Sequence, residues 1–469
     1  MFRSALLILS GNAVASLINL VRNLLIARLL PVADYGIAAT FAVAMSMVEM
    51  ASAFGLQQQI VQARDGDDPR LQAGLQGFQV LRGLVAGAAL FLLAGPFAWF
   101  LGSPQLAPAY QVLALVPVLT ALTHFDVYRL TRQMRYRPIV VANAVPPIVS
   151  LVAVWPLFHW LGDYRVMLGA LLVQALAMTV TSHLVAERGY RVSLDREVMR
   201  RGWSFGWPLL INNIMLFFVF QGDKMLVGRE LGFEALAIFA MGVTLTLTPT
   251  LVMAKSLQSY FLPQLSAAGD DPARFSDLAH AAIQASMLAA AVLLLAVFLA
   301  GEAFIQMALG PKYKDLVPIF TMLAAVHAVQ VLKSAPSTIA LARGQTGNAA
   351  IGNVFRVSSF PIIWIVLLRA AQLEHIIWIA FAAECAGVTA AFFLVRQRVR
   401  LSLRSSTLTF GALFAVVITA VFKPFIGGME ETASVPATLF LFFCVQVASS
   451  RQLGNLLILK ADEARLGDR

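Results

Sequence analysis

Charged side chains are scarce in this sequence, where aspartate, glutamate, lysine and arginine together make up only 13% of the 469 residues. Hydrophobic residues supply 59%, and the mean hydropathy is +0.77. A soluble domain does not need so large an apolar fraction, because much of its surface must be polar or charged. The composition therefore excludes a soluble globular protein and predicts a polytopic membrane protein.

The residues and motifs that usually carry catalysis or hold metals are scarce as well. The two cysteines, Cys385 and Cys444, lie inside apolar runs, and the six histidines are scattered. The sequence contains no Gly-x-x-x-x-Gly-Lys-[Ser/Thr] phosphate loop and no His-Glu-x-x-His zinc motif. We therefore expect no metal site, no bound cofactor and no enzymatic activity. The net charge of +10 is interpreted through its distribution across a membrane, so no nucleic acid is expected as a partner.

Hydrophobic stretches recur along the whole chain, and each is near the roughly 20 residues that a helix needs to cross a bilayer. They predict an all-α protein of about fourteen transmembrane helices. The predicted spans are 5–28, 35–61, 74–101, 107–128, 138–161, 165–186, 203–228, 234–262, 277–308, 315–341, 347–369, 375–395, 406–426 and 433–450.

Arginine and lysine fall mainly in alternate loops, which fixes the predicted orientation. The segments before the first span, after every second span and at the carboxyl end carry most of the basic loop residues. Basic loops stay in the cytoplasm, so we expect a multi-pass protein of the inner (plasma) membrane with both termini cytoplasmic. The longest of these loops, Glu187 to Arg201, is basic and carries Val192 and Leu194. We expect it to lie along the membrane surface.

A weak internal repeat relates the two halves of the sequence. Ala27-Arg28 aligns with Gly228-Arg229, and Leu56-Gln57 aligns with Leu257-Gln258, at one constant offset. Transporters are often built from two such repeats. The predicted organisation is a six-helix lobe over 1–186, a linker over 187–202, a second six-helix lobe over 203–395, two additional helices within 396–450 and a cytoplasmic tail over 451–469.

Charged residues inside the predicted spans are candidates for function, because a charge facing lipid costs roughly 2.5–3.5 kcal/mol on insertion scales. Four cations, from four different spans, are predicted to lie roughly 10–14 Å from the cytoplasmic helix ends. If they converge, they form a cationic layer in an inward-open cavity that suits a phosphate-bearing substrate. The alternative is that each cation is paired separately with a backbone carbonyl or a nearby acid. The acids inside the predicted spans are Glu49, Asp223 and Glu384. The four candidate substrate-binding cations are Arg82, Lys255, Lys333 and Arg356.

A second set of charges is predicted to act in gating and coupling. Arg22 and Asp223 occupy equivalent positions in the two repeats. Either a contact between them closes the outer gate, with Lys224 nearby, or one of them faces another helix. Glu49 lies near the middle of the second span. It is either the partner of a cavity cation or a coupling carboxylate for H⁺ or Na⁺.

Several segments together resemble the polysaccharide transporter family. The first is Ala27-Arg28-Leu29-Leu30-Pro31 with Asp34-Tyr35-Gly36, and the second is the opening of the second half at Arg201-Gly202-Trp203-Ser204-Phe205-Gly206. The segment Phe261-Leu262-Pro263 resembles the family's ending of the eighth helix. This family comprises the oligosaccharide flippases of O-antigen, exopolysaccharide and teichoic acid pathways, and its superfamily also holds the lipid II flippase and the multidrug and toxin extrusion (MATE) exporters.

The resemblance implies two six-helix lobes around a central cavity, related by a pseudo-twofold axis and followed by two further helices. It also implies a polyprenyl-pyrophosphate-linked oligosaccharide as substrate, moved by alternating access, with membrane lipids, a polysaccharide polymerase and glycosyltransferases as partners. A MATE-like exporter of small molecules is the main alternative, although such exporters usually carry cavity acids. A membrane glycan polymerase, which needs a long outer loop, and a non-transporting interaction protein are further alternatives.

Overall fold

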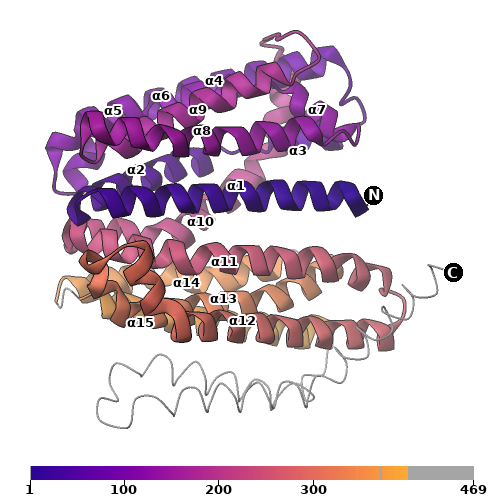
Figure 1. The fold of residues 1–469 in the computed structure, drawn as a ribbon. Helices are drawn as coiled ribbons and strands as arrows, with labels where there is room; N and C mark the ends of the chain where they lie inside the picture. The colour runs from indigo at the N-terminus through magenta and orange to yellow at the C-terminus, as the bar shows by residue number, and fades with distance from the viewer. Residues whose placement is uncertain (1, 346, 370–371, 400–469) are drawn as a thin grey trace. The chain divides into compact units, whose positions relative to one another are not determined.

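The computed structural model describes residues 2–345, 347–369 and 372–399 (Figure 1). Every regular element in this part of the chain is a helix. The predicted spans 406–426 and 433–450 and the tail lie outside the described residues. The helices are α1 (Phe2–Leu29), α2 (Val32–Ala51), α3 (Leu56–Gln62), α4 (Pro69–Phe100), η1 (Pro104–Leu106), α5 (Ala107–Leu113), α6 (Leu115–Ala121), α7 (Asp126–Arg132), α8 (Arg137–Leu161), α9 (Arg165–Leu184), α10 (Arg196–Glu230), α11 (Gly232–Ala267), α12 (Pro272–Ala308), η2 (Pro311–Leu316), α13 (Val317–Ala342), α14 (Gly347–Leu367) and α15 (Leu373–Arg398).

The described helices are those of a multi-pass membrane protein, as the composition predicts. Ten are long and apolar enough to cross a membrane, and one bent pair of helices brings the number to as many as eleven within the described residues. The 28-residue helix α1 covers the first predicted span in addition. The total of fourteen stays a prediction, because the last two spans lie outside the described part.

The chain divides into two compact units, Met1–Ala240 and Met241–Arg469. In the first unit α1 packs along α8, α8 packs against α9, and α2 packs against α10 (Figure 1). In the second unit α13 packs against both α12 and α15, and α14 packs against α15. The predicted linker over 187–202 belongs to the first unit. The lobe boundaries inferred from the repeat remain a prediction.

Two predicted spans are broken in the structure. The span predicted over 35–61 is wrong as a single helix, since α2 ends at Ala51 and α3 starts at Leu56. Gly55 between them has φ of +64°, a left-handed conformation that interrupts a helix and is readily adopted by glycine. The span predicted over 107–128 is divided as well, with a bend of 45° between Pro104–Ala121 and α7.

The seventh predicted span begins earlier than expected. Helix α10 starts at Arg196, not near residue 203, because Asp195 caps its first turn. The Asp195 carboxylate accepts hydrogen bonds from the backbone amides of Glu197 and Val198 at 2.9 and 3.3 Å. Such a cap satisfies amides that have no partner inside the helix. Part of the basic loop is therefore helical.

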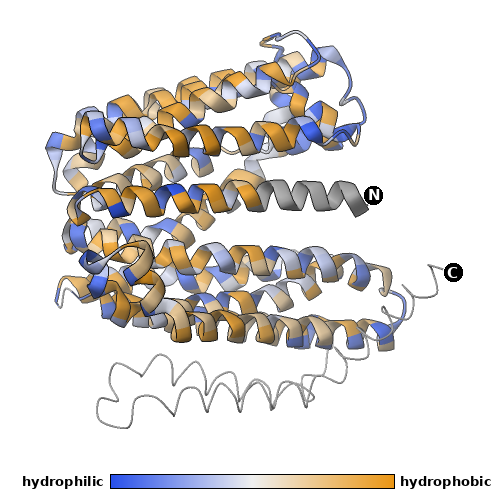
Figure 2. Ribbon diagram, in the orientation of Figure 1, coloured by the Kyte–Doolittle hydropathy of each residue, from blue (hydrophilic) through white to orange (hydrophobic). Residues whose placement is uncertain are grey.

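Large apolar side chains remain exposed on the long helices, and Figure 2 shows hydrophobic residues running along the helices. Leu92 on α4 and Val152 on α8 are 74% and 68% exposed. Trp99 and Trp160, near the ends of the same two helices, are 70% and 84% exposed. Apolar side chains along the helix and tryptophan at its end are the pattern of a surface that faces lipid.

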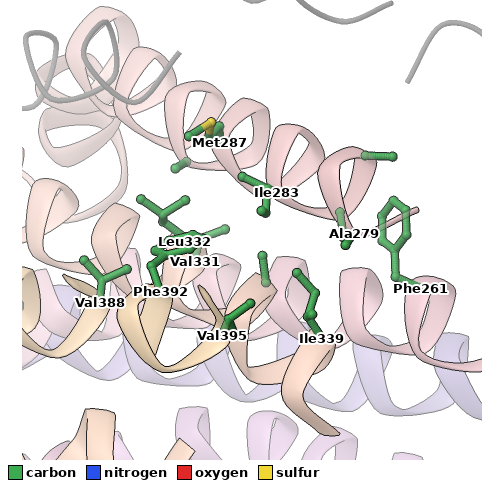
Figure 3. Packing of buried hydrophobic residues seen from close by; sticks show 14 of the residues in the cluster. Phe261, Ala279, Ile283, Met287, Val331, Leu332, Ile339, Val388, Phe392 and Val395 are labelled. Atoms are coloured by element: carbon green, nitrogen blue, oxygen red, sulfur yellow. The ribbon is translucent and has the colours of Figure 1, made fainter. Parts of the chain in front are cut away.

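The interior of the second unit is a continuous apolar cluster built from four helices (Figure 3). Phe261 comes from α11, Ile283 and Met287 come from α12, and Leu332 comes from α13. Phe392 of α15 closes the cluster. This apolar packing holds α13 and α15 side by side, which positions the charged residues that the two helices carry.

The Asp34-Tyr35-Gly36 segment has a packing role in the first unit. Gly36, in the first turns of α2, lies so close to α11 that a Cβ atom there would stand 1.8 Å from the carbonyl oxygen of Phe233. One turn later, Thr40 shares a hydrogen bond of 2.5 Å with the buried hydroxyl of Tyr110. Only glycine fits at position 36 without moving the backbone.

We expect Gly36→Ala to lower the free energy of unfolding by at least about 1–3 kcal/mol, because the added methyl group overlaps a backbone atom. The measurement is thermal unfolding of the purified protein in detergent, followed by tryptophan fluorescence. Gly347→Ala is the matched control, since a Cβ atom at Gly347 meets nothing within 4 Å. Equal melting temperatures for the two variants would contradict the packing role of Gly36.

Candidate functional site

The four predicted substrate-binding cations are divided between the two compact units. Arg82 lies on α4 in the first unit, and Lys255, Lys333 and Arg356 lie on α11, α13 and α14 in the second. Each unit therefore has a charged site of its own, and the convergence of all four cations in one layer stays a prediction.

Arg82 lines a small polar cavity in the first unit. Its Nη1 atom donates to the carbonyl oxygen of Ser52 at 2.9 Å, just after the end of α2. The cavity has a volume of about 220 Å³, and amide side chains make up much of its wall beside Arg82. Among the described residues, no acceptor lies within hydrogen-bond distance of the buried Arg82 Nε atom. Arg82 is thus partly engaged by the fold and partly available to a ligand. The amide-bearing lining residues are Gln57, Gln58, Gln79 and Asn213.

Glu49 is exposed on α2, one turn before Ser52, and it interacts electrostatically with Arg82. This arrangement favours the interpretation of Glu49 as the partner of a cavity cation. Its role in H⁺ or Na⁺ coupling stays a prediction.

In the second unit, Lys333 and Arg356 meet at one fully buried carboxylate, that of Glu384 on α15. Lys333 Nζ donates to Glu384 Oε2 at 2.7 Å and to Asn353 Oδ1 at 3.1 Å. Arg356 Nε lies 3.7 Å from Glu384 Oε1, which also accepts from Gln330 Nε2 at 2.8 Å. Among the described residues, this group consists of two cations and one anion. We call Lys333, Glu384 and Arg356 the charged triad.

A glycine pair allows α14 and α15 to come close enough to form the charged triad. A Cβ atom at Gly387 would stand 2.5 Å from the carbonyl oxygen of Gly352. Arg356 follows Gly352 by one helical turn, and Glu384 precedes Gly387 by about one turn. Small residues at such contacts let membrane helices approach closely. The glycine contact therefore sets the distance between Arg356 and Glu384.

Lys333 and Arg356 are both paired with a nearby acid. For these two of the four cations, the structure therefore shows the alternative arrangement that the sequence left open. Glu384 was identified as an acid within a span but not assigned to the site. The available signal was that it accompanies four in-span cations in the second half of the sequence, Lys224, Lys255, Lys333 and Arg356. Lys255, by contrast, is exposed on α11 and forms no ion pair with the described residues of its own unit.

The residues predicted to form the outer gate lie on two helices of the first unit, α1 and α10. Arg22 on α1 is 6% exposed, and its Nη1 atom donates to Ser150 of α8 at 3.1 Å and to Gln174 of α9. Lys224 on α10 donates to Gln221 at 3.0 Å, and Gln221 donates to Ser46 of α2 at 3.1 Å. Arg22 thus joins α1 to α8 and α9, and its contact with Asp223 stays a prediction.

One segment of the sequence matches a short catalytic motif, and its place in the structure shows that it does not form the corresponding site. Residues 202–206 read Gly-x-Ser-x-Gly, the spacing of the nucleophile elbow in α/β hydrolases. They lie inside α10, whereas an elbow needs a strand before the serine. Gly206 instead packs against the backbone of Phe54. Across the described residues, no group of three or more histidine, cysteine, aspartate or glutamate side chains is placed to hold a metal ion.

Comparison with known proteins identifies a protein family and several relatives. A family model described as "Polysaccharide biosynthesis protein" matches residues 25–318. Amylovoran biosynthesis protein AmsL of Erwinia amylovora is 21% identical over 302 residues, which cover 63% of this chain and 76% of AmsL. Lipopolysaccharide biosynthesis protein WzxC of Escherichia coli (strain K12) is 21% identical over 401 residues, which cover 82% of this chain and 77% of WzxC.

Solved structures confirm the predicted fold class. The lipid II flippase MurJ in an inward closed conformation matches with a TM-score of 0.67 and 14% identity, covering 98% of this chain and 100% of MurJ. An inward-facing MATE family multidrug transporter matches with a TM-score of 0.66 and 14% identity, covering 82% of this chain and 94% of that one. The chain therefore shares the fold of both.

We expect Gly387→Ala to destabilise the second unit by about 1–3 kcal/mol, since its methyl group overlaps the backbone of α14. Gly352→Ala serves as control from the same contact. A Cβ atom at Gly352 would lie 3.5 Å from Gly387 O and 3.6 Å from Lys333 Cδ, which are ordinary van der Waals distances. Unfolding is followed with a thiol-reactive dye that reports exposure of the cysteines on heating. A loss of the same size in both variants would contradict this account of the helix contact.

Proposed function

This chain belongs to the polysaccharide biosynthesis protein family, and from that premise we propose that it is a flippase for lipid-linked oligosaccharides. It translocates polyprenyl-pyrophosphate-linked repeat units from the cytoplasmic to the outer leaflet of the inner membrane, for cell-surface polysaccharide biosynthesis. It does so by alternating access and without catalysing a covalent step. Both termini lie in the cytoplasm, as the distribution of basic loops predicts.

The charged triad is the observation that supports this proposal most directly. Glu384 is 0% exposed and Arg356 is 4% exposed, so both charges are removed from water. Burying charge is costly unless each group is paired, and here two cations share one carboxylate. A pyrophosphate, which is doubly anionic or more, can form charge-assisted hydrogen bonds with both cations at once.

In the proposed mechanism the charged groups bind and release the substrate without changing it. Lys333 and Arg356 bind the pyrophosphate, and Glu384 takes the cations back when the substrate leaves. In the first unit, Arg82 binds anionic groups, and the neighbouring amides of Gln79 and Asn213 hydrogen-bond to sugar hydroxyls. Asparagine and glutamine suit this task because each offers a donor and an acceptor at one end.

The remaining roles follow the predictions from the sequence. Lys255 contributes a third cation of the second unit, and Arg22, Asp223 and Lys224 act in the outer gate. Glu49 is the candidate for coupling to H⁺ or Na⁺. A polysaccharide polymerase and glycosyltransferases are the expected partners. The excess of cations over acids favours an anionic substrate over the cationic compounds that MATE exporters carry.

We expect Lys333→Gln and Arg356→Gln each to slow translocation on the order of tenfold or more, because a contact between a charged group and the substrate contributes about 1.5–3 kcal/mol. The measurement is made in a strain that lacks the chromosomal copy. A membrane-impermeant glycan-modifying probe on spheroplasts shows which leaflet holds the complete repeat units. Arg274→Gln, an exposed arginine at the start of α12, is the matched control.

The deletion strain itself decides the proposal. Complete repeat units that accumulate shielded from the probe support a flippase. Units that still reach the outer leaflet without the protein, and without a second flippase, would rule it out.

A separate prediction concerns the acid of the charged triad. Glu384→Gln leaves two cations without their counter-charge, so the variant should be less stable by about 3–5 kcal/mol. A polyprenyl pyrophosphate added in detergent should raise its melting temperature more than that of the wild type, since the ligand restores the missing negative charge. The comparison is made by thermal unfolding with and without the lipid. Equal or smaller stabilisation of the variant would argue against pyrophosphate binding at the triad.

A further inference from the structure

The segment between α9 and α10 is bound tightly to the first unit. The backbone amides of Glu187 and Arg188 donate to Asp126 Oδ2 at 2.8 and 3.1 Å. The amide of Ser193 donates to the carbonyl oxygen of Ala73 at 3.0 Å, and Gly77 lies against the Ser193 backbone. Residues 187–195 are therefore a fixed part of the first unit and can form the wall of a binding site.

A polar cavity of about 250 Å³ lies between this segment, the start of α4 and the break before α7. Arg188 and Arg191 stand on one side of it, and Gln72, Gln76 and His124 stand on the other. This volume is below the range of about 300–1,000 Å³ that is usual for drug-sized ligands. The cavity suits a small charged group.

Most of the polar groups around the cavity are held in place by the protein. Arg188 Nη1 donates to the carbonyl of Asp67 and to Gln72 Oε1, both at 3.0 Å. Gln76 Nε2 donates to Thr123 O at 3.1 Å and to the Tyr190 hydroxyl at 3.2 Å. The other nitrogens of the Arg188 guanidinium have no acceptor among the described residues, so they are free to bind a ligand in a fixed orientation.

His124 supplies a further donor. It is 3% exposed, and its Nδ1 atom accepts the backbone amide of Asp126 at 3.1 Å. Because Nδ1 acts as an acceptor, the ring proton is on Nε2. Nε2 forms no close hydrogen bond with the described residues, although the ring also interacts with the backbone of Arg188. An anion in the cavity would offer Nε2 a stronger acceptor than this backbone group.

Two acids near the cavity are already paired with arginines outside its lining. Asp126 is paired with Arg129 at 2.5 Å, and Glu187 is paired with Arg135. Arg188 and Arg191 thus leave the cavity positively charged, which selects for an anion. Arginine and an N–H donor in a partly enclosed site are typical of phosphate recognition.

The surface beside the cavity indicates where the phosphate comes from. Val192 and Leu194, which directly follow Arg191, are 49% and 66% exposed. Trp203 and Trp207 on the adjoining helix α10 are 58% and 51% exposed. Exposed apolar and aromatic side chains among arginines are characteristic of a segment that lies in the headgroup region of a membrane.

From this geometry we propose that the cavity binds the phosphate group of an anionic phospholipid of the cytoplasmic leaflet, through Arg188, Arg191 and His124. The proposal uses the predicted orientation, in which the start of α4 and the end of α9 face the cytoplasm. It does not depend on the transported substrate. The bound lipid fixes the segment 187–195 against the membrane surface.

Native mass spectrometry of the full chain in detergent tests the proposal, with phosphatidylglycerol and phosphatidylcholine added in equal amounts. We expect the wild type to retain phosphatidylglycerol selectively. Arg191→Gln should weaken that retention about tenfold, as expected for the loss of a charge-assisted hydrogen bond. Arg200→Gln, an exposed arginine on α10 outside the cavity, removes the same charge and should leave retention nearly unchanged.

Three outcomes would overturn the proposal. Equal losses in the two variants would mean attraction to the basic surface in general. Equal retention of phosphatidylcholine would mean that the phosphate's net charge is not recognised. Full displacement of the lipid by millimolar inorganic phosphate, with the same dependence on Arg191, would assign the cavity to a soluble anion.

Discussion

The lack of water in the membrane interior is the constraint on which this structure depends. Any charge placed on a membrane-spanning helix must be satisfied by other protein groups or by a ligand. The described helices do this in three ways. Arg22 is held by a hydroxyl and two amide oxygens, Arg82 by a backbone carbonyl and an electrostatic interaction with Glu49, and Lys333 with Arg356 by Glu384. Each arrangement leaves a different number of hydrogen-bond donors available to a ligand, which accords with the different roles proposed for these residues.

Apolar packing around the charged triad fixes the positions of its charged groups. The apolar cluster around Ile283 and Phe392 aligns α12, α13 and α15, and the contact between Gly352 and Gly387 brings α14 against α15. Glu384 on α15 is thereby enclosed by groups from two neighbouring helices, α13 and α14. Because the carboxylate cannot move far, the energy of the triad depends on the charges present and less on rearrangement of the helices.

The sequence was sufficient to predict the long helices, because apolar length is itself the physical requirement for crossing a bilayer. It was not sufficient to predict the breaks. Gly55 is followed by Leu56, Ile60 and Val61 as well as by several glutamines, so a single span could be predicted across it. Its left-handed φ shows that the helix stops. The depth of Lys333 and Arg356 could be estimated from helical rise, but their shared partner could not. Pairing with Glu384 depends on which helix faces meet, and a repeat or a hydropathy pattern does not record that.

The hydrogen bond from Arg82 to Ser52 has a consequence for the junction between α2 and α3. The Ser52 carbonyl lies where the helix has ended, so no helical amide is available to replace the guanidinium. An anion that accepts the hydrogen bond of Arg82 Nη1 would leave the Ser52 carbonyl without its donor. Ligand binding in the cavity and an ordered junction between α2 and α3 are then linked thermodynamically. The free energy by which an ordered junction weakens ligand binding equals the free energy by which the bound ligand destabilises the ordered junction. A ligand that reaches Arg82 would thus loosen the polypeptide at the point where its second helix is interrupted.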